Sequence, residues 1–129
     1  MKLRIQDNLL RLRLTQKEVA QLHESGLVES AIRFPPGRAL TYSVASSRDA
    51  DEISVDYYCD SIRVALPREV VTVWAESNQV SLEGSRHLPV QILVEKDFQC
   101  LHKPEERDPD GYPNPLAVTQ SLSPIPGPA

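Results

Sequence analysis

A chain of 129 residues with 40% hydrophobic side chains fits a single domain that can bury its own core without disulfides or a metal. Its formal net charge of −4 argues against a dedicated nucleic-acid binder, because such proteins usually carry a basic excess. The N-terminus lacks the apolar run of a signal peptide, and no stretch approaches the roughly 18 apolar residues of a membrane helix. A cytoplasmic protein that crosses no membrane is therefore predicted.

The N-terminal quarter predicts a strand hairpin followed by a helix. Leu10–Leu14 alternates leucine with arginine, which is the period of a half-buried strand, and Met1–Ile5 has a similar alternation. A capping box then begins at Thr15, in which the Thr15 and Glu18 side chains bond the free amides of a first helical turn. Gly26 is a natural stop, so one helix is predicted between Thr15 and Gly26.

The rest of the chain predicts mainly strands. These are Val28–Phe34, Ala39–Ser46, Ile53–Tyr58, Ser61–Leu66, Gln79–Glu83 and Pro89–Asp97. The segment Pro67–Trp74 is ambiguous, because a proline at a first helical position favours a helix whereas the β-branched run Val70–Val73 favours a strand. We predict a second short helix there, with Trp74 in the core.

Many short strands with few helices predict an α+β fold. We expect a mainly antiparallel sheet, curled or partly closed, with one or two short helices. Residues 1–112 are predicted to form this single domain, and residues 113–129, which are rich in proline, are predicted to form a disordered tail. A strand–helix–strand pattern occurs at Leu10–Phe34 and again at Ile62–Glu83, which either reflects a duplicated unit or arises by chance.

Cys100 and His102 are the candidates for a metal site, because two residues apart in a strand they point to the same side. A structural zinc site needs four ligands, and Cys59, His23 and His87 stand at no diagnostic spacing. We therefore predict no metal and interpret Cys100 as a small buried hydrophobe. No nucleophile elbow and no glycine-rich phosphate loop occurs, so an enzyme is the less favoured hypothesis and no cofactor is expected.

Arginines are the more suggestive side chains, because several lie on strand faces opposite the apolar ones. The candidate ligand-binding residues are Arg4, Arg11, Arg13, Arg33 and Arg63. If their strands are neighbours, one sheet face carries a stripe of guanidinium groups suited to phosphate or to a carboxylate-rich partner. Alternatively, these arginines pair with Glu29, Asp56 and Glu95 across strands and form an ordinary solvated face.

The opening MKLRIQDNLLRLRLTQKEV, the segment LVEKDFQCL and Tyr112–Pro115 together resemble a family of small bacterial proteins known only as a domain of unknown function. The resemblance covers about residues 1–115. It implies a bacterial cytosolic protein whose folded unit ends near Pro115, and it implies no activity, cofactor or catalytic residue.

A second resemblance is short. Ile62–Val70 is similar to the strand–Pro–helix signature of swapped-hairpin transition regulators, which bind DNA as dimers. The sequence departs from that signature where Glu76-Ser77-Asn78 replaces the expected Gly-Asp turn.

The sequence therefore predicts a small non-catalytic binding or adaptor domain that recognises a protein or a phosphate-containing ligand through its arginines. A dimeric DNA-binding regulator is the first alternative, although nucleic acid is not the expected partner. A small enzyme or a metal-binding protein that uses Cys100 and His102 is the second.

Overall fold

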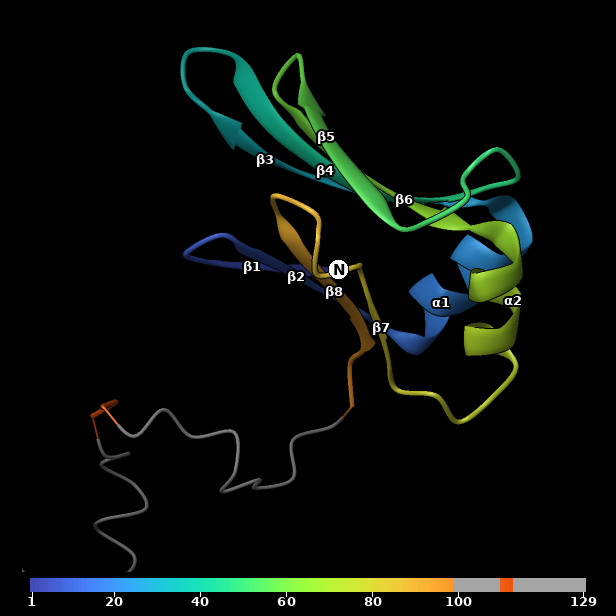
Figure 1. Cartoon of the computed structure of the whole chain (residues 1–129). Coiled ribbons are helices and arrows are strands. Elements are labelled where there is room, and N and C mark those ends of the chain that lie inside the picture. The colour runs from blue at the N-terminus through green and yellow to red at the C-terminus, as the bar shows by residue number, and fades with distance from the viewer. Residues whose placement is uncertain (99–109, 113–129) are drawn as a thin grey trace, which may run out of the picture. The chain divides into compact units, whose positions relative to one another are not determined.

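The order strand, strand, helix, strand, strand occurs twice along the chain (Figure 1). The first half contains β1 (Lys2–Gln6), β2 (Leu9–Leu14), α1 (Gln16–Ser25), β3 (Leu27–Phe34) and β4 (Arg38–Ser47). The second contains β5 (Ser54–Tyr58), β6 (Ser61–Pro67), α2 (Arg68–Ala75), β7 (Ser81–Glu83) and β8 (Gln91–Lys96). The computed structural model describes residues 1–98 and 110–112, and all of these elements belong to one unit, residues 1–98.

Helix α1 begins and ends where its capping residues predict. The Thr15 side chain accepts a hydrogen bond from the amide of Glu18, and the Glu18 carboxylate accepts one from the amide of Thr15 at 2.9 Å. Gly26 ends the helix in the left-handed region at φ 85°, where a side chain would be strained. The first predicted helix is confirmed.

The ambiguous segment after β6 is a helix, as predicted. Pro67 precedes its first turn, and Val71 and Trp74 face the core from positions three residues apart on one side of the helix. Burial of this face outweighs the weak strand preference of the β-branched residues, because tertiary packing contributes more than intrinsic propensity.

The eight strands of residues 1–98 form two four-stranded sheets, neither of which closes. Sheet A has the order β1-β2-β8-β7, and sheet B has the order β3-β4-β6-β5. Each half of the chain gives one hairpin to each sheet, and the halves meet along two parallel pairs, β2 with β8 and β4 with β6. All other pairs are antiparallel. The predicted α+β fold with mainly antiparallel strands is confirmed, but its strands are divided between two open sheets.

The two halves supply the core from equivalent positions. In the parallel pairs Leu12 lies opposite Val94, and Val64 lies opposite Val44. Aligning the halves on these residues matches the following buried pairs: Leu12 with Val64, Leu14 with Leu66, Val19 with Val71, Leu22 with Trp74, Val28 with Leu82, and Val44 with Val94. The strand–helix–strand pattern seen in the sequence is thus part of a longer structural repeat.

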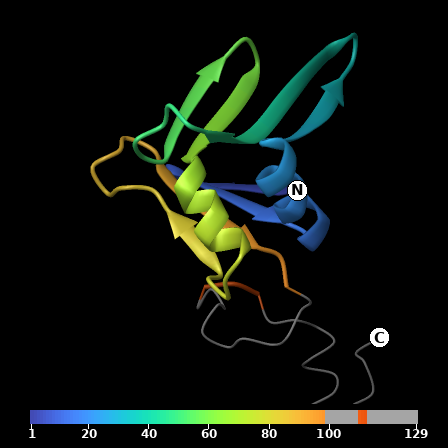
Figure 2. The ribbon, with the colours of Figure 1, turned by 90° about the vertical axis from the view of Figure 1, so that its right-hand side faces the viewer.

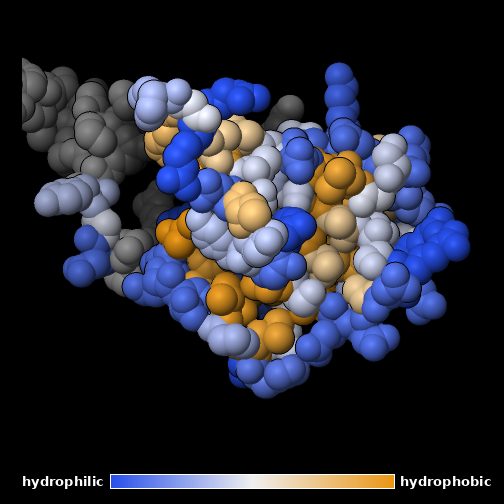
Figure 3. Space-filling model, turned by 90° about the horizontal axis from the view of Figure 1, so that it is seen from above, coloured by the Kyte–Doolittle hydropathy of each residue, from blue (hydrophilic) through white to orange (hydrophobic). Residues whose placement is uncertain are grey.

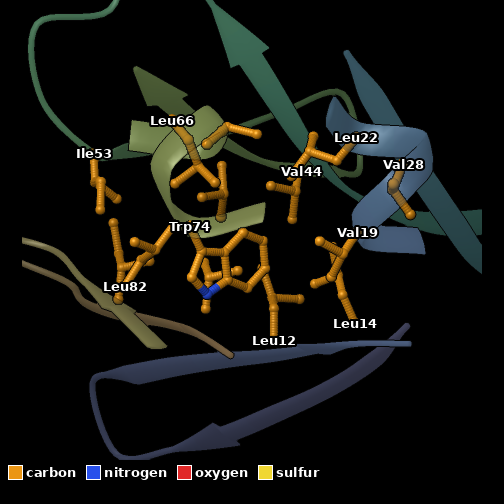
Figure 4. Close-up of a cluster of buried hydrophobic side chains, with 14 of the residues drawn as sticks. Leu12, Leu14, Val19, Leu22, Val28, Val44, Ile53, Leu66, Trp74 and Leu82 are labelled. Carbon is orange, nitrogen blue, oxygen red and sulfur yellow. The ribbon is translucent and has the colours of Figure 1, made fainter. Parts of the chain in front are cut away.

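Trp74 lies in the middle of this core, among side chains from both sheets and both helices (Figure 4). It is fully buried, and its Nε1 donates a hydrogen bond to the Val80 carbonyl at 3.1 Å, which satisfies its one polar atom. The predicted core role of Trp74 is therefore confirmed.

Helices α1 and α2 lie side by side at one end of the unit of residues 1–98 (Figure 1), and the β3–β4 and β5–β6 hairpins diverge toward their tips (Figure 2). Within the described residues no helix is long and apolar enough to cross a membrane. The predicted tail, residues 113–129, lies outside the described residues.

Candidate anion-binding face of sheet A

Strands β1 and β2 bring four basic side chains onto one face. Their antiparallel register places Lys2 opposite Arg13 and Arg4 opposite Arg11. Side chains alternate between faces along a strand, and the buried leucines of β2 point into the core. The basic residues therefore share the outer face of sheet A, which we call the basic face.

Two carboxylates at the end of β8 partly neutralise the basic face. Glu95 accepts hydrogen bonds from the Nε atoms of Arg11 and Arg13, the latter at 2.9 Å. Asp97 lies 3.0 Å from the Nζ of Lys2. The sequence offered the pairing of Glu95 with arginines as an alternative, but it did not predict the pairing of Asp97 with Lys2. Asp97 follows Glu95 by two residues, and that spacing is the signal that could have revealed it.

Glu95 is held ionised by its two arginines. Burial of this carboxyl raises its pKa, but the hydrogen bonds and charges of Arg11 and Arg13 outweigh burial and hold the pKa of Glu95 below its ordinary value. The shared carboxylate also fixes the two guanidinium groups side by side.

Among the described residues, basic side chains outnumber carboxylates on the basic face. Four cations on β1 and β2 lie beside Glu95 and Asp97. Arg4 is exposed and pairs with no carboxylate among the described residues. The one further carboxylate that the strand register places on this face of sheet A is Glu83, on the far edge strand β7.

The five candidate arginines do not form one stripe, because they lie on two sheets. Arg4, Arg11 and Arg13 share the basic face, whereas Arg33 and Arg63 lie on the outer face of sheet B. Arg63 bonds Asp56 at 3.2 Å and lies over the ring of Tyr58. The predicted pairs with Asp56 and Glu95 are thus present, and no pair between a candidate arginine and Glu29 is found in the described residues.

The repeat provides an internal comparison for the basic face. Strands β5 and β6 pair in the same register as β1 and β2, with Asp56 opposite Arg63 where Arg4 lies opposite Arg11. The second half therefore carries different residues at three of the four basic positions: Ser54 for Lys2, Asp56 for Arg4, and Ala65 for Arg13. The equivalent hairpin forms there with one of the four basic side chains, Arg63, so this strand pairing does not require the other three.

The metal and thiol candidates add no further site to the described part of the chain. Cys100 and His102 lie outside it. Cys59 is an exposed free thiol in the β5–β6 turn. No group of three or more His, Cys, Asp or Glu residues that could hold a metal ion occurs among residues 1–98 and 110–112.

The chain belongs to a family of unknown function, DUF7009, which matches residues 1–116. This confirms the resemblance seen in the sequence. No curated protein and no solved structure matches the chain. The similarity of Ile62–Val70 to swapped-hairpin regulators therefore stays a prediction.

Proposed function

We propose that this chain is a small cytosolic, non-catalytic binding domain that holds a phosphate-bearing or carboxylate-rich ligand on the basic face of sheet A. The observation that carries the proposal is the cluster of four basic side chains on β1 and β2, with Arg4 exposed, of which the equivalent strands of the second half keep one.

Arginine suits this role, because its planar guanidinium can donate two parallel hydrogen bonds to phosphate or carboxylate oxygens. Arg4 offers such a group without a competing carboxylate among the described residues. Arg11, its neighbour across the hairpin, is already oriented by Glu95. Fixing a side chain before the ligand arrives reduces the entropy lost on binding.

The site is open to solvent, so its binding must depend on salt. The Lys2 and Arg4 side chains are exposed, and salt screens charges at the surface more strongly than buried ones. We therefore expect the affinity for a small anion to fall as ionic strength rises.

The test is a thermal melt with inorganic pyrophosphate as the probe. The wild-type melting temperature should rise with pyrophosphate at low ionic strength, and the double variant Arg4→Ala/Arg11→Ala should lose this rise relative to its own ligand-free value. Arg63→Ala is the matched control, because Arg63 occupies the position equivalent to Arg11 in the second half, and it should keep the rise. An equal rise in all three proteins would refute the site.

A further inference from the structure

Strand β3 forms the longest free edge of the two sheets. It has 8 residues, it pairs with β4 on one side, and no strand pairs with its other side among the described residues (Figure 2). The other edge strands are shorter, with 5 residues in β1 and β5 and 3 in β7. An edge strand presents backbone N–H and C=O groups that can pair with a strand of another chain. The edge of β3 therefore offers the longest template for such pairing.

Two hydrogen bonds show which backbone groups of β3 point outward. The Ser46 amide donates to the Gly26 carbonyl at 2.9 Å, one step beyond the first pair of the β3–β4 register. Because opposite residues of antiparallel strands alternate between bonded and non-bonded pairs, even-numbered residues of β3 bond β4 and odd-numbered ones point away from it. The Leu27 carbonyl accordingly accepts a hydrogen bond from the Gln21 side chain at 3.0 Å. The next odd-numbered residues, whose N–H and C=O groups point outward, are Glu29, Ala31 and Arg33.

The side chains of this edge carry two opposite charges. Glu29 and Arg33 are exposed on the outer face of sheet B, and neither has a charged partner among the described residues. On β4 they lie opposite the uncharged Ser43 and Ala39. Ala31 lies midway between them, two residues from each. Opposite charges at equal distances from a small central residue make the strand complementary to an antiparallel copy of itself.

A two-fold axis at Ala31 sets Glu29 of each copy opposite Arg33 of the other. Residues at equal distances from such an axis lie opposite each other, so Ala31 faces its own copy between the two charged pairs. Each of these three pairs would exchange both backbone hydrogen bonds, since their N–H and C=O groups point outward. Moving the axis by one residue, to Ser30 or Ile32, separates Glu29 from Arg33. The charges therefore favour the axis at Ala31.

The other face of β3 adds apolar contacts in the same register. Phe34 and Ile32 are 50% and 49% exposed, and they point to the side of the buried Val28, which they follow at even spacings. About the axis at Ala31, Phe34 lies opposite Val28 of the second copy, and aromatic–β-branched pairs of this kind stabilise antiparallel strands. Apolar side chains also reach the surface among hydrophilic ones in the view from above (Figure 3). The register thus gives the half-exposed Phe34 an apolar neighbour.

The other edge strands are not complementary to their own copies. About its central residue, β1 would set Arg4 opposite Arg4 of the second copy, and β5 would do the same with Asp56. Like charges directly opposite each other destabilise a strand pair. The charge pattern therefore distinguishes β3 from the edges of equal kind in this fold.

We propose that two copies of this chain form a two-fold dimer by antiparallel pairing of their β3 strands about Ala31. The two four-stranded B sheets would then join into one sheet of eight strands. The same strand serves both copies, as two-fold symmetry requires, and the edge of β3 is covered. No residue of the basic face lies on β3, so the pairing uses none of the groups proposed to bind an anion.

Sedimentation velocity of the full chain, from micromolar to near-millimolar concentration, tests the proposal. The wild type should show a concentration-dependent dimer. Glu29→Arg and Arg33→Glu each set like charges opposite each other in both charged pairs, so each should raise the Kd by about tenfold or more. An equimolar mixture of the two variants should dimerise about as tightly as the wild type, because every pair then joins an arginine to a glutamate. Glu83→Arg is the matched control, since it reverses an exposed glutamate on the edge strand β7 and should leave the Kd unchanged.

Ala31→Pro tests the backbone part of the contact. The Ala31 N–H points away from β4, so a proline there removes no hydrogen bond of the β3–β4 hairpin, and proline is tolerated on edge strands in this orientation. The dimer would lose both hydrogen bonds of its central pair. The variant should keep the wild-type circular dichroism spectrum and raise the Kd by about tenfold or more.

Three outcomes would overturn the dimer. A wild type that stays monomeric throughout the range would leave the edge of β3 to a strand of a different protein. A dimer whose Kd is unchanged by both Glu29→Arg and Arg33→Glu would use a different surface. A mixture that dimerises no more tightly than either variant alone would refute the axis at Ala31. Both charged residues are exposed, so their variants should keep the wild-type circular dichroism spectrum, and a weaker dimer would not reflect unfolding.

Discussion

Glu95→Gln should destabilise the fold at neutral pH by about 1–2 kcal/mol. Each hydrogen bond to a charged group contributes roughly 1.5–3 kcal/mol, and Glu95 accepts one from Arg11 and one from Arg13. The Arg13 side chain is 36% exposed, so solvent screening reduces the contribution of its pair. A glutamine keeps one weaker acceptor and turns an amide donor toward two guanidinium groups. The substitution therefore removes most of the stabilisation that these two hydrogen bonds contribute after screening.

The cost of this substitution should disappear in acid. The pKa of Glu95 is lower in the folded state than in the unfolded state, so its stabilisation is present above the unfolded-state pKa and is lost as the pH falls through the folded-state pKa. The difference in unfolding free energy between wild type and Glu95→Gln should therefore shrink as the pH falls below the ordinary glutamate value.

Urea denaturation at neutral and acidic pH measures both effects, and Glu83→Gln is the control. Glu83 lies on the same face of sheet A and is exposed, with no charged partner among the described residues, so its substitution should change stability little at either pH. The proposed role of Glu95 would be refuted by a neutral-pH cost no larger than that of Glu83→Gln. A cost that persists unchanged in acid would also refute it.

Two further predictions concern the first helix and the nucleic-acid alternative. Thr15→Ala should lower the unfolding free energy, measured by urea denaturation, by about 1 kcal/mol, because it removes the N-cap acceptor for the Glu18 amide. Thr15→Ser should keep most of the wild-type stability. Equal stabilities of all three proteins would contradict the role of Thr15 as the cap. If duplex DNA binds the basic face, the logarithm of its binding constant should fall with the logarithm of the salt concentration. The slope of that plot should be no steeper than about −4, since four cations can neutralise at most four phosphates. A steeper slope in a gel-shift series would favour the DNA-binding alternative.

Local signals in the sequence are sufficient for the first helix. The capping box at Thr15 and the glycine at Gly26 act within one turn of each helix end, so they can be recognised without knowledge of the fold. The helix after Pro67 has weaker local signals, because its β-branched residues oppose a helix and the burial of Val71 and Trp74 compensates for them.

Strand pairing could not be predicted in the same way. A period of two residues shows which side chains share a face, but it does not show which strand lies beside which. Leu12 pairs with Val94, about 80 residues later, and this contact leaves no local trace in the sequence. For that reason the arginines were correctly assigned to polar faces, but their division between two sheets became visible only in the structure.

The repeat within this chain distinguishes what the fold requires from what it leaves free. Core positions are matched between the halves, as with Leu14 and Leu66, because each half must bury the same faces. The basic face of β1–β2 and the long β3–β4 hairpin have no counterpart in the second half, which folds with a different outer face and a shorter hairpin. Folding alone therefore does not account for either feature.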